Sequence, residues 1–246
     1  GMDAEGNLIL DIKINEGNLY YFGDIAFIGN TKYSNKELAD LVGISKGDIY
    51  NENIMQTRLL GSPDSRDVHS LYLDNGYLFS QVNPVETNVN NDTINMEVRI
   101  YEGTQARVNR VSVVGNTKTN DHVIMREIRT KPGDLFNRSL IIRSNRELAT
   151  LNYFNAETLD IDVEPDAQNG TVDLTYKVEE KSSDQIELQG GWGANRIIGT
   201  FRVSFNNFSS RNFFKKGAWA PLPSGDGQRL SLSASSNGVQ YQSYNI

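Results

Sequence analysis

The chain repeats itself, and this repeat limits the possible folds more than any other feature of the sequence. Gly29-Asn30-Thr31-Lys32 recurs as Gly115-Asn116-Thr117-Lys118, Gly47-Asp48-Ile49-Tyr50-Asn51 recurs as Gly133-Asp134-Leu135-Phe136-Asn137, and Glu16-Gly17 recurs as Glu102-Gly103. All three pairs are 86 residues apart. A shared offset over three motifs indicates a duplicated structural unit, so the fold must be built from two copies of one arrangement.

Each copy begins with a strand that leads into a helix. The strands are expected at 21–28 and 107–114, and the glycine that follows each strand allows a turn. In the first copy Ser34 and Glu37 form a capping box at the start of the helix. In the second copy we expect the helix at 120–129, with Val123, Ile124 and Ile128 turned inward.

A second helix follows the Gly-Asp turn in each copy. Asn51 and Asn137 are suitable N-cap residues. In the second copy the helix has an amphipathic pattern with Ile141, Leu148 and Leu151 inward. From Gly47 to Tyr77 the first copy spans 30 residues where Gly133 to Tyr153 spans 20, so it carries 10 extra residues. The extra segment contains Gly61-Ser62-Pro63, which predicts a split helix.

Two strands close each copy, and the last one alternates strictly. Its apolar residues are Ile94, Met96, Val98 and Ile100 in the first copy and Val172, Leu174, Tyr176 and Val178 in the second. Leu8, Leu10, Ile12 and Ile14 alternate in the same way before Glu16-Gly17. The element order is therefore β-α-α-β-β and the fold class α+β. We expect repeats at 18–103 and 104–181, preceded at 1–17 by the last strand of a truncated third repeat.

The segment 182–246 differs in composition from the repeats. It holds 6 basic and 3 acidic residues, whereas residues 1–181 hold 18 and 28. Apolar and polar residues alternate around Ile186-Leu188-Trp192, Phe201-Val203-Phe205 and Leu230-Leu232-Ala234. Such segments are typical of outer-membrane barrel strands, although soluble sandwiches share the pattern. The prediction is the first strands of an incomplete outer-membrane β-barrel.

The composition excludes most catalytic and metal chemistry. The chain has no cysteine and two histidines, which removes disulfides, thiolate sites and histidine-rich metal clusters. Asp160, Asp162, Glu164 and Asp166 have the spacing of a calcium loop, but Pro165 stands where that loop needs glycine, and the alternation fits an acidic strand face. Neither repeat gathers an acid, a base and a nucleophile. We therefore predict no enzyme, no catalytic residues, no metal site and no cofactor.

Taken in order, these motifs resemble a known family. A strand ending in Gly-Asn, a central Gly-Asp, Gly-Tyr-Leu-Phe at 76–79 or Asn-Tyr-Phe at 152–154, and a closing Val/Ile-x-Glu-Gly resemble polypeptide-transport-associated (POTRA) domains. The passage from Glu179-Glu180-Lys181 into Gln185–Gly193 resembles the step from the last such domain into the first barrel strand of the BamA family. The inserted segment and Asn152, which replaces a glycine, depart from the pattern.

The resemblance implies a periplasmic arm on an outer-membrane assembly factor. The implied partners are unfolded outer-membrane proteins, accessory lipoproteins and the outer membrane itself, with no nucleic acid. A three-stranded sheet offers unpaired backbone groups at its edge, and these groups bind an extended strand whatever its sequence. In the family the second strand lies at the edge, so the client-binding residues are expected to be Leu78, Phe79, Val82, Val85, Val89, Phe154, Leu159, Ile161 and Val163.

Other uses of these surfaces stay open. The edges could instead pack against a neighbouring repeat or an accessory lipoprotein. Arg126, Glu127 and Arg129 are a candidate docking site for an accessory subunit, with an ordinary solvated face as the alternative, and Arg126 and Glu127 are not expected to pair on a helix. A two-partner-secretion translocator, which exports one dedicated substrate, and a soluble enzyme or adhesin are the alternative functions.

Overall fold

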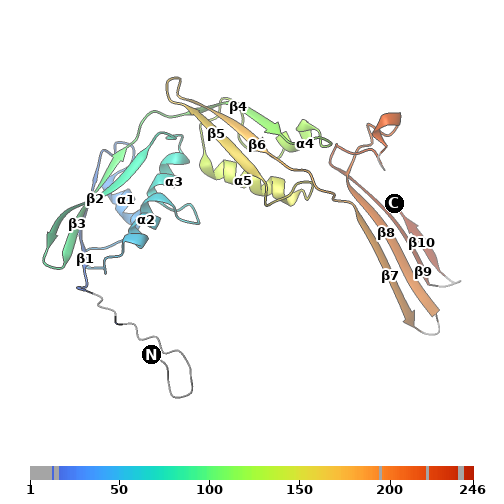
Figure 1. Cartoon of the computed structure of the whole chain (residues 1–246), viewed down its shortest axis with the longest axis horizontal. Coiled ribbons are helices and arrows are strands. Elements are labelled where there is room, and N and C mark those ends of the chain that lie inside the picture. Colours follow the sequence, from blue (N-terminus) through green and yellow to red (C-terminus); the bar gives the residue numbers. More distant parts are fainter. Residues whose placement is uncertain (1–12, 14–16, 194–195, 220–221, 238–240) are drawn as a thin grey trace, which may run out of the picture. The chain divides into compact units, whose positions relative to one another are not determined.

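The computed structural model describes residue 13 and residues 17–193, 196–219, 222–237 and 241–246 (Figure 1). The chain divides into two compact units, one of Gly1–Leu71 with Ser80–Glu102 and one of Tyr72–Phe79 with Gly103–Ile246. The strand expected at 8–14 lies outside the described residues, apart from Lys13. The truncated third repeat therefore stays a prediction.

The first repeat is a three-stranded sheet packed against helices. Its sheet has the order β1-β3-β2, with β1 parallel and β2 antiparallel to the central strand. The core is made by one face of the sheet and the facing helix residues, including Phe22, Leu38, Val42, Met55, Leu59 and Val98. The elements are β1 (Tyr21–Ile28), α1 (Asn35–Val42), α2 (Glu52–Leu60), α3 (Val68–Leu73), β2 (Gln81–Asn90) and β3 (Thr93–Tyr101).

Local signals set the helices of this repeat as predicted. The Ser34–Glu37 capping box begins α1, and Gly43 ends it with a positive φ of 61°. The second helix is split into α2 and α3, which confirms the effect of the insertion. The buried Asp67 carboxylate accepts from Ser62 N at 3.0 Å and Ser70 N at 2.9 Å. These bonds hold the break between the two helices together.

The second repeat has the same topology, with the sheet order β4-β6-β5 and α5 along one face (Figure 1). Its buried residues include Val108, Ile124, Leu148, Phe154, Leu174 and Tyr176. The elements are β4 (Arg107–Val114), α4 (Asp121–Met125), α5 (Arg138–Thr150), β5 (Asp160–Asp166) and β6 (Thr171–Lys177). The strand bounds 21–28 and 107–114 are confirmed in the two repeats.

The first helix of the second repeat is shorter than predicted. It ends at Met125 and does not continue to Arg129. The backbone N–H of Arg129 donates to Ser144 Oγ at 2.9 Å and so leaves the helical pattern. Ile128 is still buried, because the turn after the helix carries it into the core.

Residues 72–79 belong to the first repeat in sequence but pack in the second unit. Leu73 is part of the second core, and Leu78 and Phe79 contact it. The Asp74 carboxylate accepts from Ser139 N at 2.7 Å and Ser139 Oγ at 2.6 Å. These bonds supply a carboxylate to the first turn of α5, where the helix dipole favours negative charge.

The tail forms an antiparallel sheet with the order β10-β9-β8-β7. Its strands are β7 (Gln185–Gly193), β8 (Arg196–Phe208), β9 (Gln228–Asn237) and β10 (Gln242–Asn245), with a short 3-10 helix, η1 (Lys216–Ala218), between β8 and β9. The predicted alternating segments are therefore strands. The incomplete barrel stays a prediction.

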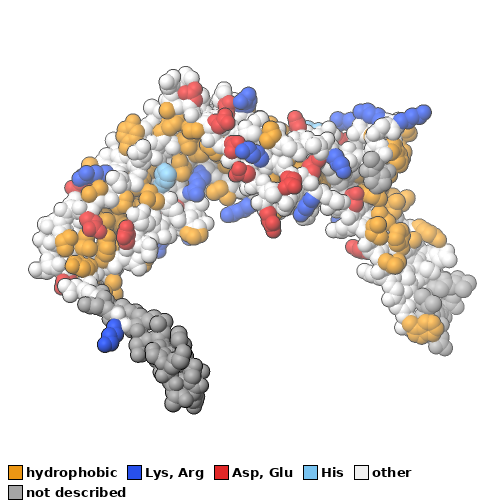
Figure 2. Space-filling model, viewed as in Figure 1, with side chains coloured by type: hydrophobic (Ala, Val, Ile, Leu, Met, Phe, Trp, Pro, Cys, Tyr) orange, Lys and Arg blue, Asp and Glu red, His pale blue; other side chains and the backbone are white. Residues whose placement is uncertain are grey.

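One face of the tail sheet is apolar and exposed. Ile186, Leu188 and Trp192 are 74%, 82% and 75% exposed, and Leu188 is paired with the half-exposed Phe201. Figure 2 shows hydrophobic side chains at the surface of the tail. The residues between them are polar, with an ion pair of 3.1 Å between Arg202 and Glu187. No helix within the described ranges is long and apolar enough to cross a membrane.

Candidate strand-binding edges

In each repeat the second strand, β2 or β5, forms an open sheet edge. Both strands are hydrogen-bonded on one side only, to β3 and to β6. The second strand of each copy was expected at the edge, and this position is confirmed. A strand at an edge presents a row of N–H and C=O groups that another extended chain can pair with.

The opposite edges, at β1 and β4, are partly covered by the repeated Gly-Asp motif. Phe22 N donates to Asp48 O and Gly47 N donates to Phe22 O, both at 2.8 Å. In the second repeat Gly133 N donates to Val108 O at 2.7 Å, and Val108 N donates to Asp134 O at 2.9 Å. The motif therefore occupies the first two residues of each of these strands, 21–22 on β1 and 107–108 on β4.

On the first edge, the predicted residues are not equally accessible. Val82, Val85 and Val89 lie on β2, where Val82 is buried, Val85 is half-buried and Val89 is 49% exposed. Leu78 and Phe79 precede the strand and contact the core of the second unit. Their assignment to the edge was wrong, because the chain joins the sheet only at Gln81.

On the second edge, Ile161 and Val163 lie on β5, and Val163 is 38% exposed. Phe154 and Leu159 precede this strand. Phe154 is fully buried and forms an isolated bridge with Glu180, and Leu159 packs on the core. Neither side chain is on the open edge, so the boundary of the predicted edge was set too early in this repeat as well.

The side chains of β5 make its solvent face acidic. Asp160, Asp162 and Glu164 alternate with Ile161 and Val163, as the strand pattern predicted. Lys177 Nζ lies 2.5 Å from Asp162 Oδ2, and this hydrogen bond raises the pKa of Lys177. Among the described residues, no group of three or more possible ligands could hold a metal ion.

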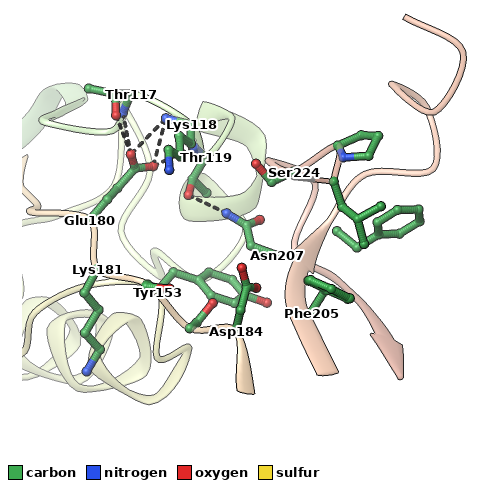
Figure 3. A pocket seen from close by; sticks show the side chains of 15 residues that line it. Thr117, Lys118, Thr119, Tyr153, Glu180, Lys181, Asp184, Phe205, Asn207 and Ser224 are labelled. Carbon is green, nitrogen blue, oxygen red and sulfur yellow. Dashed lines mark hydrogen bonds between the residues drawn. The ribbon is translucent and has the colours of Figure 1, made fainter. Parts of the chain in front are cut away.

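In the second repeat, the carboxylate of Glu180 holds the Gly-Asn-Thr-Lys loop that follows β4 (Figure 3). Glu180 accepts from Thr117 N at 3.0 Å, Lys118 N at 2.9 Å and Thr119 N at 2.6 Å. Burial opposes the charged form, but the bonds from Thr117, Thr119 and Lys118 outweigh it, so the pKa of Glu180 is lowered.

The same clamp occurs in the first repeat, where Glu102 accepts from Thr31 N and Lys32 N, both at 2.8 Å. In the sequence, Glu102 stood out only as part of the recurring Glu-Gly pair and Glu180 only as part of the passage into the tail. Their recurrence together with Gly-Asn-Thr-Lys was the signal that links them.

The clamped loop of the second repeat contacts the loop before β9. Asn120 N donates to Gly225 O at 2.9 Å, and Asn120 Nδ2 donates to Asp226 Oδ1 at 2.8 Å. Ser209 Oγ donates to the other oxygen of this carboxylate at 2.6 Å. Burial raises the pKa of Asp226, but the bonds from Ser209 and Asn120 outweigh it and the pKa is lowered. No local sequence signal marked Asp226, because its partners lie far away in the chain.

A small cavity of about 230 Å³ lies beside this contact. Thr117, Tyr153, Glu180, Asn207 and Ser224 are among the residues that line it (Figure 3). Asn207 Nδ2 donates to Thr119 Oγ1 at 2.9 Å across it. Two of the lining side chains, Glu180 and Asn207, bond to residues 117–119 and so help to hold the loop in place.

The predicted docking residues do not form one helical face. Arg126 and Glu127 follow the end of α4, and Arg126 Nε lies 3.1 Å from Glu127 Oε1. Our expectation that they would not pair was wrong, because neighbouring side chains diverge on a helix but not in this turn. Arg129 instead binds Glu147 on α5, with Nη2–Oε1 at 2.8 Å and Nε–Oε2 at 3.0 Å.

Comparison with known proteins agrees with this architecture. The family model described as "Surface antigen variable number repeat", POTRA, matches residues 20–103 and 106–181. The outer membrane protein assembly factor BamA of Nitratidesulfovibrio vulgaris is 31% identical over 237 residues, which are 94% of this chain and 28% of that protein. BamA of Neisseria meningitidis serogroup B is 29% identical over 219 residues, 87% of this chain and 26% of that protein.

A solved structure gives the same fold. The crystal structure of BamA from Haemophilus ducreyi lacking POTRA domains 1-3 superimposes with a TM-score of 0.66 at 20% identity, over 89% of this chain and 37% of that chain. The chain spans about a quarter of the length of the curated relatives it matches.

The two matched repeats cover more than half of the sequence, and the chain belongs to the POTRA family. Together with these relatives, they support a POTRA region of a BamA-family protein.

Proposed function

We propose that this chain is the periplasmic arm of an outer-membrane protein assembly factor. It receives unfolded β-barrel proteins by pairing their extended strands with β2 and β5, and it helps to insert them into the outer membrane. The observation that carries the proposal is the pair of open antiparallel edges, each opposite an edge that a Gly-Asp loop partly covers. Backbone pairing accepts any client sequence, as a general assembly factor requires.

The tail and the docking residues extend this proposal. The exposed apolar face of Ile186, Leu188 and Trp192 suits contact with lipid in the first strands of a barrel. Arg126, with a side chain 49% exposed, is the residue of this set that would contact an accessory lipoprotein. The names of the relatives favour an assembly factor over a translocator dedicated to one substrate.

Site-specific photo-crosslinking tests the client edges. A photoreactive residue is placed at Val85 or Val163 in the whole chain and mixed with a synthetic peptide that alternates apolar and polar residues like a barrel strand. We expect crosslinks from both positions. Asn109, exposed on β4 beside the covered edge, is the matched control.

A second peptide, methylated at alternate backbone nitrogens, has the same side chains but cannot donate to the edge. Loss of crosslinking with this peptide supports strand pairing. Equal crosslinking of both peptides, or equal yield from Asn109, contradicts the proposal.

The docking site has its own test. Arg126→Glu should reduce co-purification of an accessory subunit with the full-length protein. Arg129→Glu also breaks the ion pair with Glu147, so Arg129→Glu combined with Glu147→Arg serves as the control that restores that pair. Unchanged co-purification of Arg126→Glu contradicts docking at this site.

A further inference from the structure

Each open edge strand carries one proline, Pro84 on β2 and Pro165 on β5. In an antiparallel pair, successive residues point their N–H and C=O groups alternately toward the neighbouring strand and away from it. A proline that points inward breaks the sheet, whereas one that points outward removes a donor from the open edge. The hydrogen bonds of the central strand fix this direction in both repeats.

In the second repeat, β6 fixes the direction. Val178 N donates to Val114 O at 2.9 Å, so even-numbered residues of this strand point to β4. Odd-numbered residues therefore point to β5, and Lys181 N agrees, since it donates to Tyr153 O at 2.8 Å on that side.

The register of β5 then gives its outward groups. The odd-numbered residues of β6 are opposite the even-numbered residues of β5, such as Thr175 opposite Asp162. These pairs are the hydrogen-bonded ones. Ile161, Val163 and Pro165 therefore turn their backbone groups to the open edge.

In the first repeat, β3 fixes the direction in the same way. Tyr21 N donates to Asp92 O at 2.7 Å, so even-numbered positions of this strand point to β1 and odd-numbered ones to β2. Asn83 is opposite Arg99 and is thus bonded inward. Val82, Pro84 and Glu86 point outward, up to a register shift between Glu86 and Asn88.

Both prolines therefore interrupt the donor row of an open edge. On β2, Pro84 separates the outward N–H groups of Val82 and Glu86. On β5, Pro165 ends the row after Ile161 and Val163. A proline still offers its carbonyl oxygen, so each edge can pair but forms one hydrogen bond fewer than a continuous strand.

We infer that Pro84 and Pro165 limit the backbone length over which a client strand pairs at each edge, and so keep a captured strand exchangeable. This inference rests on the function proposed above. A client strand must leave the arm to join a barrel, and an uninterrupted edge would hold it more tightly. On β2 and β5 the other outward N–H groups still point to the open edge. The prolines therefore restrict pairing without preventing it.

Peptide affinity of proline variants tests the inference. Pro84→Thr and Pro165→Thr each restore one outward donor in the whole chain. Asn83→Thr and Glu164→Thr are the matched controls, because they add the same residue where the N–H is already bonded inward. Binding is measured by fluorescence anisotropy with the labelled barrel-strand peptide. We expect each proline variant to bind about 3- to 10-fold more tightly, the effect of one added hydrogen bond.

The outcomes separate this inference from the proposed function. A gain that disappears with the backbone-methylated peptide supports it. Equal affinity of proline variants and controls, with the wild-type chain binding normally, overturns the inference and leaves the proposed function intact. If the variants associate with one another but bind the peptide no better, the prolines protect against self-pairing and the inference is wrong. No binding by any chain overturns both.

Discussion

Glu180 is the residue whose loss should most disturb the second repeat without removing core volume. Its carboxylate accepts from three consecutive backbone N–H groups and from Thr117 Oγ1 at 2.5 Å. A hydrogen bond to a charged group contributes about 1.5–3 kcal/mol to stability. Glu180 is only partly buried, so water replaces some of the lost bonds. We expect Glu180→Ala to lower the free energy of unfolding by about 2–3 kcal/mol.

The effect should be local and can be followed by hydrogen exchange. In the whole chain, amides 117–119 should exchange faster in Glu180→Ala, while amides of β5 keep their protection. Glu179→Ala is the matched control, since the neighbouring side chain is exposed. Equal exchange of these three amides in both variants would show that the loop is held by other contacts.

The pKa of Glu180 gives the same prediction a pH dependence. Because the folded-state pKa is lowered, the charged form stabilises the fold fully above the unfolded pKa, about 4.3, and this contribution is lost as the pH falls through the folded pKa. The stability difference between the wild-type chain and Glu180→Gln should therefore be present at neutral pH and shrink below about pH 4. A difference that is constant down to pH 3 would contradict the assigned role of the charge.

Three further predictions concern packing, backbone and the tail. Leu148→Ala removes a fully buried side chain and should cost about 2–5 kcal/mol in urea unfolding; a loss below about 0.5 would show that the helix register is wrong. Gly115→Ala should destabilise more than Gly133→Ala in the same assay, since both have φ of 94° but only at Gly115 would the added Cβ overlap a carbonyl oxygen; equal losses would contradict this. Leu188→Ser with Trp192→Ser should make the chain elute later in size-exclusion chromatography, because the exposed apolar face drives self-association; an unchanged elution volume would contradict that role.

The regular parts of the fold could be predicted because their signals are local. The capping box of Ser34 and the alternation in β3 and β6 depend on residues a few positions apart, and both were confirmed. Because the chain is duplicated, each element predicted in one repeat could be compared with its equivalent in the other. The split of the second helix followed from the glycine and proline of the insertion.

The parts that could not be predicted depend on bonds between distant residues. Arg129 leaves the helix because its N–H bonds to Ser144 on α5, which no local pattern records. Leu78 and Phe79 looked like edge residues, but they pack in the second unit. Side-chain alternation also does not tell which N–H groups of β2 and β5 point to the open edge. That direction is known only when the hydrogen bonds to the neighbouring strand are known.

Comparing the two repeats shows which features both share and which belong to the second repeat alone. In the first repeat Ser34 caps α1, a helix of 8 residues. The equivalent Asn120 makes no cap with its side chain and bonds to Asp226 instead, and α4 has only 5 residues. The second repeat thus has a shorter helix where it gains a contact with the tail. Three features are the same in both repeats: the carboxylate that binds the Gly-Asn-Thr-Lys loop, the Gly-Asp motif that covers the start of one edge strand, and the open edge strand, β2 or β5. A role common to both repeats must lie in these features. Of the three, only the strand offers unpaired backbone groups to a partner.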